Sequence, residues 1–448
     1  MRVSCQRDFE TLKLNTNYLS NKPPLKGQVL YKLPIGSIRA KGWLQHQLEL
    51  MVKGMVGRLA EISDFLKDNN GWFQRDNYGW EEQPYWLRGF YKLAVLTQSE
   101  ELLKEAGRWI NCVLESQDEN GYFGPRGLKN VRLENGDELV DLWPHMVMLD
   151  AIITHYEYTG DNRAIPFMKK FFEFCSSIPE NKFIPSPNFR ENKIQFLAGD
   201  KRYIDIINEQ LGKGSSRWFV QWPRAGEMLP HIYWLYNQVK EEWLLKLATR
   251  FYRHIMPPIG EWLHDHVVNF TQRFRYPGNY YLQTGEKWYI KQSEYWYRQH
   301  MDTWGQQPRG AFAADERIRP GYVDPRQAIE TCAIVEFAKS FNILGRITGD
   351  TIYADRCEDI ILNHFPAAQL PDMRGVRYLT ASNMPMSDAT FNHDYYNDKR
   401  YAKRLEISQV VFTARGHRCC QHNHGIGWPS YVENLWQVTH DDGLAAWL

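Results

Sequence analysis

The side chains with the clearest chemistry are one carboxylate and three cysteines at two places in the chain. Glu330 and Cys332 lie two residues apart, and Cys419 and Cys420 form an adjacent pair far downstream. Three thiolates and one carboxylate supply the ligand count of a closed zinc site, in which four protein ligands surround the ion. The sequence therefore predicts that these four residues bind Zn²⁺.

The backbone around these residues must bring them to one point. Residues two apart on a regular helix point to nearly opposite sides, so Glu330 and Cys332 can share an ion only where the backbone is extended. Residues 333–344 then carry apolar side chains at helical spacing, with Thr331 as a candidate N-cap. A helix N-terminus stabilises thiolates. The Cys419–Cys420 pair also precedes an expected helix, so zinc would join two helix starts.

Composition and charge favour a neutral ligand. The 448 residues include 54 Lys and Arg against 53 Asp and Glu, and this net charge of +1 gives no electrostatic basis for binding nucleic acid or an anionic membrane. Aromatic residues make up 14% of the chain, and some adjoin carboxylates, as in the cluster of Trp80, Glu81 and Glu82. Aromatic faces stack on sugar rings while acids bind the hydroxyls, so we expect an oligosaccharide or glycan; the alternative is that these aromatics are ordinary core. The oligomeric state stays unknown.

Cysteine usage and the N-terminal residues bear on the compartment. The seven cysteines are an odd number and lack the spacing of a disulfide framework. Cys112 and Cys175 lie in apolar helical runs and are expected to be inert core residues. Residues 1–17 are polar, and no apolar run approaches the ~20 residues of a membrane span. We expect a cytoplasmic chain, or a periplasmic or secreted one if the N-terminus is incomplete.

Helical patterns recur along the chain and come in pairs. Three of the breaks between them are alike, with Thr-Gly-Asp at 159–161 and 348–350 and Thr-Gly-Glu at 284–286. Paired helices that close into a ring form an (α/α)6 toroid, a mostly α fold whose inner helix ends line one deep pocket; an open helical solenoid is the alternative. The expected helices span residues 38–52, 86–96, 101–114, 145–158, 164–175, 227–238, 241–255, 287–301, 333–347 and 352–365.

Other stretches lack the helical pattern. Residues 182–200 and 211–227 are rich in Pro, Gly, Ser and aromatics, which predicts long loops over a pocket rim. Runs of β-prone residues at 376–380 and 409–413 predict strands. We expect three parts: an N-terminal extension over 1–34, an (α/α)6 catalytic domain over 35–436, and at 437–448 the start of a β-sandwich domain that continues beyond the printed sequence.

From residue 35 onward, several motifs resemble glycoside hydrolase family 127, the zinc-dependent glycosidases with a cysteine nucleophile that are typified by β-L-arabinofuranosidases. Glu-Thr-Cys-Ala at 330–333 matches one signature of that family, and Cys419-Cys420 followed by Asn423 matches its Cys-Cys-x-x-Asn signature. His266 and His145 stand where substrate-contacting histidines occur in the family. The motifs are specific because they occur together in this order and spacing.

The resemblance implies a retaining glycoside hydrolase that releases a terminal L-arabinofuranose-like or acidic pectic sugar from plant glycans. It implies that the Cys419 thiolate is both a zinc ligand and the nucleophile, while a carboxylic acid protonates the leaving oxygen and later activates water. His145, His266 and the cluster of Trp80, Glu81 and Glu82 are expected to bind the sugar hydroxyls.

The general acid is the point where this chain departs from the family pattern. The family's acid/base glutamate lies sixteen residues before its glutamate ligand, where this chain has Ala314. Glu316 is the nearest match and is assigned the role, with Asp315 as its rival. Three arginines follow between residues 317 and 326, and they favour an acidic sugar because arginine binds carboxylates in a bidentate manner; the alternative is that they form ordinary surface pairs.

Three other functions stay open on the sequence. The zinc could be purely structural in an (α/α)6 hydrolase or lyase that uses paired carboxylates, Glu81 or Glu82 with Asp315 or Glu316. The protein could be a non-catalytic sugar-binding relative that keeps the pocket. Finally, the adjacent cysteines could form a strained vicinal disulfide with a redox role, which leaves Glu330 without a purpose.

Overall fold

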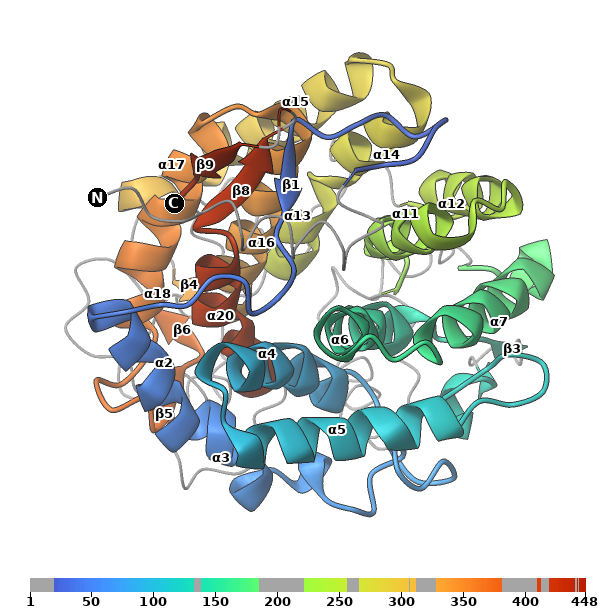
Figure 1. Cartoon of the computed structure of the whole chain (residues 1–448), viewed down its shortest axis with the longest axis horizontal. Helices are drawn as coiled ribbons and strands as arrows, with labels where there is room; N and C mark the ends of the chain where they lie inside the picture. The colour runs from blue at the N-terminus through green and yellow to red at the C-terminus, as the bar shows by residue number, and fades with distance from the viewer. Residues whose placement is uncertain are drawn as a thin grey trace, which may run out of the picture.

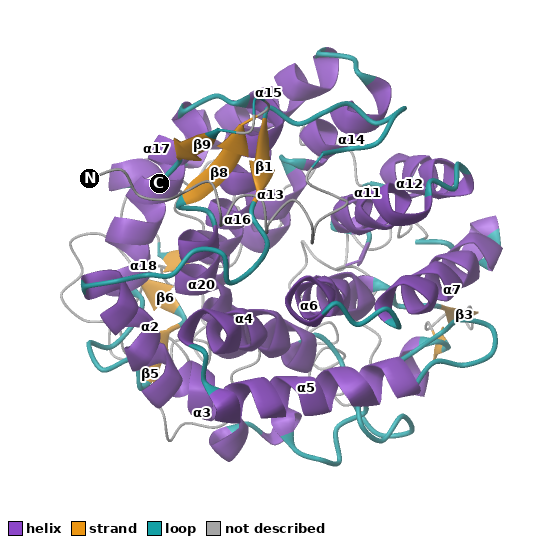
Figure 2. Ribbon diagram, in the orientation of Figure 1, coloured by secondary structure: helices purple, strands orange, loops and turns teal. Residues whose placement is uncertain are grey.

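The computed structural model describes residues 20–132, 138–184, 221–255, 266–305, 307–311, 328–380, 409–411, 419–439, 441 and 443–448. Helices predominate in these ranges, and the strands are short (Figure 2). No helix in the described ranges is both long and apolar enough to cross a bilayer. The expected rim loops at 182–200 and 211–227 lie mostly outside the described residues.

Helical hairpins succeed one another around a ring with an inner and an outer layer (Figure 1). In each hairpin the first helix is inner and the second is outer. The hairpins are α4 (Glu82–Thr97) with α5 (Glu100–Glu115), α6 (Trp143–Thr159) with α7 (Ala164–Ser177), α11 (Met228–Val239) with α12 (Trp243–Arg253), α14 (Tyr276–Thr284) with α15 (Trp288–Trp304), and α16 (Thr331–Thr348) with α17 (Ile352–Asp359). The short helix α13 (Val267–Arg273) precedes α14 and packs on α16.

Both ends of the described chain supply the remaining helical pair. The inner part is α19 (Cys419–Asn423), the 3₁₀ turn His424–Ile426 and α20 (Gly427–Glu433), which pack on α4 and α16. The outer part is α2 (Trp43–Lys53), followed by α3 (Met55–Ile62), and α2 packs on α20. This pair closes the ring, so the predicted (α/α)6 toroid is confirmed and the open solenoid is wrong.

Burial distinguishes the two layers. Residues 143–149 of α6 are buried without exception, although His145 is among them. The outer α5 instead buries only a stripe of apolar residues and exposes its charged side chains. A helix enclosed on all sides is apolar around its whole circumference, whereas one that faces water on one side is amphipathic. The two patterns therefore place the inner helices next to the ring axis.

The three Thr-Gly breaks end three inner helices in the same way. Gly160, Gly285 and Gly349 have φ angles of 70°, 72° and 71°, the left-handed conformation that glycine adopts without a steric penalty. At each break the backbone N–H two residues after the threonine donates to its Oγ1 at 3.2 Å. The helix ends predicted from these triplets are confirmed.

Two helix bounds differ from expectation for local reasons. The helix expected from residue 38 begins at Trp43, because Gly42 takes a φ of 63°. The helix expected over 352–365 becomes a π-helical turn at Ile360–His364, followed by the short α18 (Phe365–Ala367). Pro366 lies in this last segment and lacks the N–H that a continuous α-helix requires.

Short antiparallel sheets complete the described structure. Strands form in both β-prone runs, as predicted: β5 (Gly375–Arg377) and β6 (Leu379–Thr380) in the first and β7 (Gln409–Val411) in the second. β5 pairs with β7, and β6 pairs with β4 (Ile329–Glu330). A separate ribbon pairs β2 (Val131–Arg132) with β3 (Glu138–Leu139). A three-stranded sheet has the order β1 (Leu30–Lys32), β8 (Trp436–Thr439), β9 (Leu444–Ala446). It joins residues from both sides of the expected boundaries at 34 and 436, and the three-part division of the chain stays a prediction.

Candidate metal centre and active site

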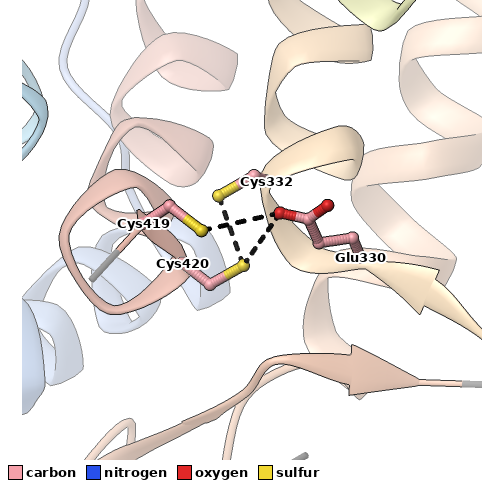
Figure 3. A group of neighbouring side chains, drawn as sticks. All are labelled: Glu330, Cys332, Cys419 and Cys420. Atoms are coloured by element: carbon pink, nitrogen blue, oxygen red, sulfur yellow. Dashed lines mark hydrogen bonds between the residues drawn. The ribbon is translucent and has the colours of Figure 1, made fainter. Parts of the chain in front are cut away.

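The four predicted zinc ligands lie together at the starts of α16 and α19 (Figure 3). Their ligand atoms lie within 4.8 Å of one another. Glu330 ends strand β4 with an extended backbone, at φ −76° and ψ 133°, and Cys332 follows in the first helical turn. Cys419 and Cys420 open α19. The extended backbone lets Glu330 and Cys332 face the same point although they are only two residues apart.

Thr331 plays a different part from the expected one. The N-cap of α16 is Glu330, and the Thr331 hydroxyl donates to the Arg377 carbonyl at 2.6 Å. The Thr331 N–H donates to the Tyr378 carbonyl at 3.0 Å. These bonds attach the start of α16 to the β5–β6 segment and thereby hold the carboxylate and the first thiol in place.

The donor set fits a tetrahedral zinc ion. Both Cys419 Sγ and Cys420 Sγ lie 3.6 Å from Glu330 Oε1, close to the roughly 3.5 Å that a tetrahedron with Zn–S near 2.3 Å requires. Cys332 Sγ and Cys420 Sγ are 3.2 Å apart, somewhat less than the corresponding separation of about 3.8 Å. All three cysteines are free thiols, so no vicinal disulfide joins the adjacent pair.

Burial and mutual hydrogen bonding single out one of the thiols. Cys332 and Cys420 are 1% and 0% exposed, whereas Cys419 is only half-buried. Burial raises the pKa of the Cys332 and Cys420 thiols, and burial together with the charge on Cys419 raises the pKa of the Glu330 carboxyl. Hydrogen bonds from Cys332 and Cys420 hold the pKa of Cys419 well below its usual range. The accessible sulfur is therefore the one whose thiol has the lowest pKa of the three.

Two further side chains contact the four predicted ligands. Tyr378, which lies between β5 and β6, places its hydroxyl 3.2 Å from Cys419 Sγ. His266 precedes α13, and its Nδ1 accepts the Val268 N–H at 3.1 Å, which leaves Nε2 as the protonated nitrogen of the neutral ring. That Nε2 lies 3.6 Å from Glu330 Oε2, and the imidazole is 31% exposed. His266 can therefore donate a hydrogen bond beside the metal centre.

The cluster Trp80, Glu81 and Glu82 lies at the start of α4. Glu81 accepts the indole N–H of Trp143 at 2.5 Å and lies 3.7 Å from the Arg224 guanidinium. Burial raises the pKa of Glu81 to about 8, although Arg224 opposes that shift. Glu82 accepts the Tyr78 hydroxyl at 3.2 Å, and the Trp80 indole donates to Asp141 at 2.9 Å. Because Cys419 also contributes to the raised pKa, Glu81 is electrostatically coupled to the metal centre.

His145 lies within the protein wall. Its imidazole is fully buried, contacts the Phe123 carbonyl oxygen at 2.9 Å and stacks on Phe171 with ring centroids 5.2 Å apart. Burial lowers the pKa of His145 to about 4, so the ring is neutral at physiological pH. The described contacts of His145 are with these aromatic and backbone groups rather than with the four ligands.

Two functional candidates carry no motif in the sequence. Tyr378 is one, and only the pairing of β4 with β6 brings it to Cys419. Arg224 is the other: it is 4% exposed, donates to Tyr85 at 3.0 Å and to Asn269 at 2.8 Å, and its charge acts on Glu330. The residues expected to supply the general acid, Glu316 and Asp315, lie outside the described residues, as does Ala314.

Comparison with known proteins identifies a related catalytic domain. The profile of the β-L-arabinofuranosidase GH127 catalytic domain matches residues 13–184 and 197–433. No curated protein sequence matches the chain.

Solved structures of similar fold include a GH127 β-arabinofuranosidase, with 14% identity and a TM-score of 0.63 over 94% of this chain and 64% of that one. For a GH127 β-L-arabinofuranosidase from Geobacillus stearothermophilus T6, the identity is 13% and the TM-score 0.62, over 92% of this chain and 67% of that one. An unsaturated glucuronyl hydrolase from Streptococcus agalactiae has 8% identity and a TM-score of 0.52, over 87% and 91%. The chain thus spans about 64% of the first of these proteins. At such low identities the likeness concerns the fold alone.

Proposed function

Because this chain belongs to glycoside hydrolase family 127, we propose that it is a retaining glycosidase that releases a terminal L-arabinofuranose-like or acidic pectic sugar from plant glycans. The observation that supports the proposal is the half-buried Cys419 sulfur, which lies among three further side chains of the types that can bind zinc, at the starts of two helices. An accessible thiolate in such a group is suited to attack carbon. The proposal concerns the whole activity, including the choice of sugar.

Glu330, Cys332, Cys419 and Cys420 would hold the zinc ion. When bound, Zn²⁺ keeps the thiols ionised at neutral pH and neutralises the charge that the buried carboxylate and thiolates accumulate. The site offers three sulfur atoms and one oxygen atom. This donor set favours Zn²⁺ over Mg²⁺ or Ca²⁺. The free thiols also suit a reducing compartment, so we propose the cytoplasm as the location of the protein.

The chemistry divides into two displacements at the anomeric carbon. In the first, Cys419 Sγ forms a bond to that carbon while the bond to the leaving oxygen breaks, and Glu316 gives its proton to that oxygen. In the second, Glu316 takes a proton from water, and the water oxygen displaces the sulfur. Two inversions restore the original configuration, so the product sugar retains it. His266 would donate its Nε2 proton to a sugar hydroxyl beside the thiolate, and Tyr378 would hold the sulfur in place.

A second candidate mechanism rests on Glu81. This carboxyl is buried, and its pKa of about 8 keeps it protonated at neutral pH, which is the state that a general acid requires. In that case the zinc group is structural, and Glu81 acts with a second carboxylate in place of Cys419. This mechanism corresponds to the alternative considered from the sequence, in which two carboxylates catalyse the reaction.

Metal content and turnover measured together test the proposal. The zinc-loaded protein, Cys419→Ser and the matched Cys112→Ser variant are assayed on nitrophenyl furanosides and pectic oligosaccharides; Cys112 is a half-buried thiol on the outer α5. We expect about one zinc per chain in the wild type and turnover lost only in folded Cys419→Ser, by roughly a thousandfold or more. Unimpaired Cys419→Ser would favour the paired carboxylates. Sugar binding without turnover in the wild type would identify a non-catalytic relative.

A further inference from the structure

A pocket of about 320 Å³ lies beside the start of α4, outside the group of four predicted metal ligands. Its walls come from the 3₁₀ turn Asp64–Leu66 and from the loop that leads into α4. The lining residues are Asp64, Phe65, Asn69, Asn70, Asn77 and Tyr78. Pockets for small molecules have volumes of roughly 300–1,000 Å³, so this one has room for a single ring rather than for a longer chain.

Two contacts connect this pocket with the elements that carry the predicted ligands. The Tyr78 hydroxyl donates to Glu82, the first residue of α4, at 3.2 Å. The Phe65 ring packs edge-on against His422, with ring centroids 5.8 Å apart. His422 lies on α19, one helical turn after Cys419. The pocket therefore lies at the same end of the ring as the predicted ligands.

The lining groups have the chemistry of a sugar-binding surface. Phe65 and Tyr78 are half-buried, with ring centroids 5.9 Å apart, and they offer aromatic surface to the C–H groups of a sugar ring. Asp64 and Asn69 are exposed, and their side chains form no hydrogen bond within the described part of the chain. Their polar groups can therefore exchange water for sugar hydroxyls without breaking a bond inside the protein.

Hydrogen bonds within the loop fix the shape of the pocket before a ligand binds. Asn70 Nδ2 donates to the Phe65 carbonyl at 2.6 Å, and Asn77 Nδ2 donates to the Asn69 carbonyl at 2.9 Å. The loop also folds closely upon itself at Gly71, where a Cβ would lie 2.5 Å from the Asn77 carbonyl oxygen. A site that is ordered in advance loses less conformational entropy on binding.

The charge of the lining decides which sugars the pocket suits. Among the described residues no lysine or arginine lines it, whereas Asp64 contributes a carboxylate. Lys67 belongs to the same loop, but its ammonium group donates to the carbonyls of Ala60 and Glu61 at 2.5 and 3.1 Å and is thus directed back to α3. A sugar carboxylate would face Asp64 without a counter-charge, so the pocket suits a neutral sugar.

We propose that this pocket binds a neutral sugar of the glycan on the leaving-group side of the cleaved bond. The inference rests on the proposed function, in which the enzyme releases a terminal sugar. The released sugar then lies beside Cys419, so every further sugar of the substrate lies on the other side of the bond. Phe65 and Tyr78 pack against the ring of that sugar, and Asp64 and Asn69 bind its hydroxyls.

The ratio of kcat/KM for two substrates tests this role. One is a neutral β-L-arabinofuranosyl trisaccharide, and the other is methyl β-L-arabinofuranoside, which has no sugar on the leaving side. We expect the double variant Asp64→Ala/Asn69→Ala to lower the ratio of the first to the second by about tenfold. Asp68→Ala is the matched control and should keep the ratio, because Asp68 lies in the same loop but pairs with Arg108 and is 79% exposed. An unchanged ratio in the double variant would overturn the proposal.

Binding without turnover separates this inference from the proposed activity. A sulfur-linked form of the trisaccharide, which resists hydrolysis, is titrated by calorimetry into the zinc-loaded wild type and the double variant, with trigalacturonate and L-arabinose for comparison. We expect the sulfur-linked trisaccharide to bind the wild type more tightly than L-arabinose does, and the double variant to bind it about tenfold more weakly. Unchanged circular dichroism and Tm in the variant exclude unfolding as the cause.

The outcomes of this titration are distinct. Equal affinity of the two proteins for the sulfur-linked trisaccharide would overturn the proposal. Trigalacturonate binding that is lost in the double variant would show that the pocket takes acidic sugars, which also contradicts it. If the protein hydrolyses no glycoside but binds the trisaccharide through Asp64 and Asn69, the pocket is supported as a site for neutral sugars and the proposed glycosidase function is wrong.

Discussion

Glu336 and Asn423 lie one helical turn after Cys332 and Cys419, and the Asn423 amide donates to the Glu336 carboxylate at 3.3 Å. The Arg88 guanidinium joins both, since it pairs with Glu336 and donates to Asn423 Oδ1 at 2.5 Å. The two helices that carry the predicted metal ligands are therefore bonded to each other one turn below those residues. Asn423 is the last residue of the Cys-Cys-x-x-Asn motif, and this contact explains why the motif places an asparagine there.

We expect Asn423→Ala to lower the zinc affinity by about 10–100-fold, because residues that orient metal ligands have effects of this size. The measurement is competition with a chromogenic chelator. Asn363→Ala, at an exposed position of the π-helical turn, is the control. Wild-type zinc affinity in a folded Asn423→Ala variant would show that the amide has no part in holding the ligands.

If zinc binds as proposed, its removal should destabilise the whole ring, because the ion would join α16 and α19. Without it, a buried carboxyl and three clustered sulfur atoms must share a site with no compensating cation. We expect the Tm to fall by roughly 5 °C or more on chelation and to recover on adding back about one equivalent of Zn²⁺. Calorimetry under reducing conditions measures both. An unchanged Tm would mean that the four residues carry no metal in the folded protein.

Glu81 should make stability depend on pH. The pKa of Glu81 is about 8 in the folded chain against an ordinary 4.5, so only the unfolded chain ionises between these values. Folding therefore binds a proton in this window, and stability falls as the pH rises from about 4.5 to about 8. Glutamine cannot ionise, so Glu81→Gln removes this pH dependence. Its free energy of unfolding should gain about 2–4 kcal/mol relative to the wild type as the pH rises across this window. Denaturant melts at several pH values measure this, with exposed Glu119→Gln as the control; parallel pH profiles for wild type and Glu81→Gln would contradict it.

The general acid can be identified from paired variants. With Glu316 in that role, Glu316→Gln should lose about 10²–10⁴-fold in kcat on substrates with poor leaving groups and much less on activated nitrophenyl glycosides. Asp315→Asn and Glu81→Gln should keep the wild-type dependence on the leaving group. If Glu81→Gln alone shows the selective loss, Glu81 is the acid.

Two of the glycines that end inner helices, Gly160 and Gly349, should differ in how well they tolerate substitution by alanine. Gly160 and Gly349 share nearly the same φ, so alanine costs about 1–2 kcal/mol at either from backbone strain alone. A Cβ at Gly160 would meet nothing within 4 Å, whereas one at Gly349 would lie 2.6 Å from Val29 Cγ1. Gly349→Ala should therefore cost more and loosen the segment around Val29. Denaturant unfolding compares the two, and equal losses would show that Val29 moves aside freely.

The sequence predicts the frame of the protein well because its signals are local. The inner α6 is apolar around most of its circumference and the outer α5 is amphipathic, and a glycine after threonine ends three of the inner helices, so periodicity and turn chemistry suffice for the fold. The clustering of Glu330, Cys332, Cys419 and Cys420 is also accessible to sequence reasoning, because cysteine is rare and Glu330 lies only two residues from one.

The rest of the site depends on contacts that leave no local trace. Tyr378 reaches Cys419 through strand pairing, and Arg88 on α4 reaches Glu336 on α16, 248 residues further along the chain. His145 illustrates the converse, since its position in a motif does not reveal that Phe123 and Phe171 enclose it. Such long-range packing is decided by tertiary structure rather than by spacing.

Ring closure by the two ends of the chain has a consequence for how the protein folds. Cys332 and Cys420 are 88 residues apart, and α20 packs on α2 from the opposite end of the chain. Contacts between residues so far apart in sequence form late, because closing the long intervening loop costs entropy. The last inner helices of the ring can therefore take their place only after α19 and α20 have left the ribosome. The proposed metal centre would thus be completed by the final element of the ring. Zinc uptake would report that synthesis of the ring has finished, and a chain stopped before residue 419 would leave a gap beside α4.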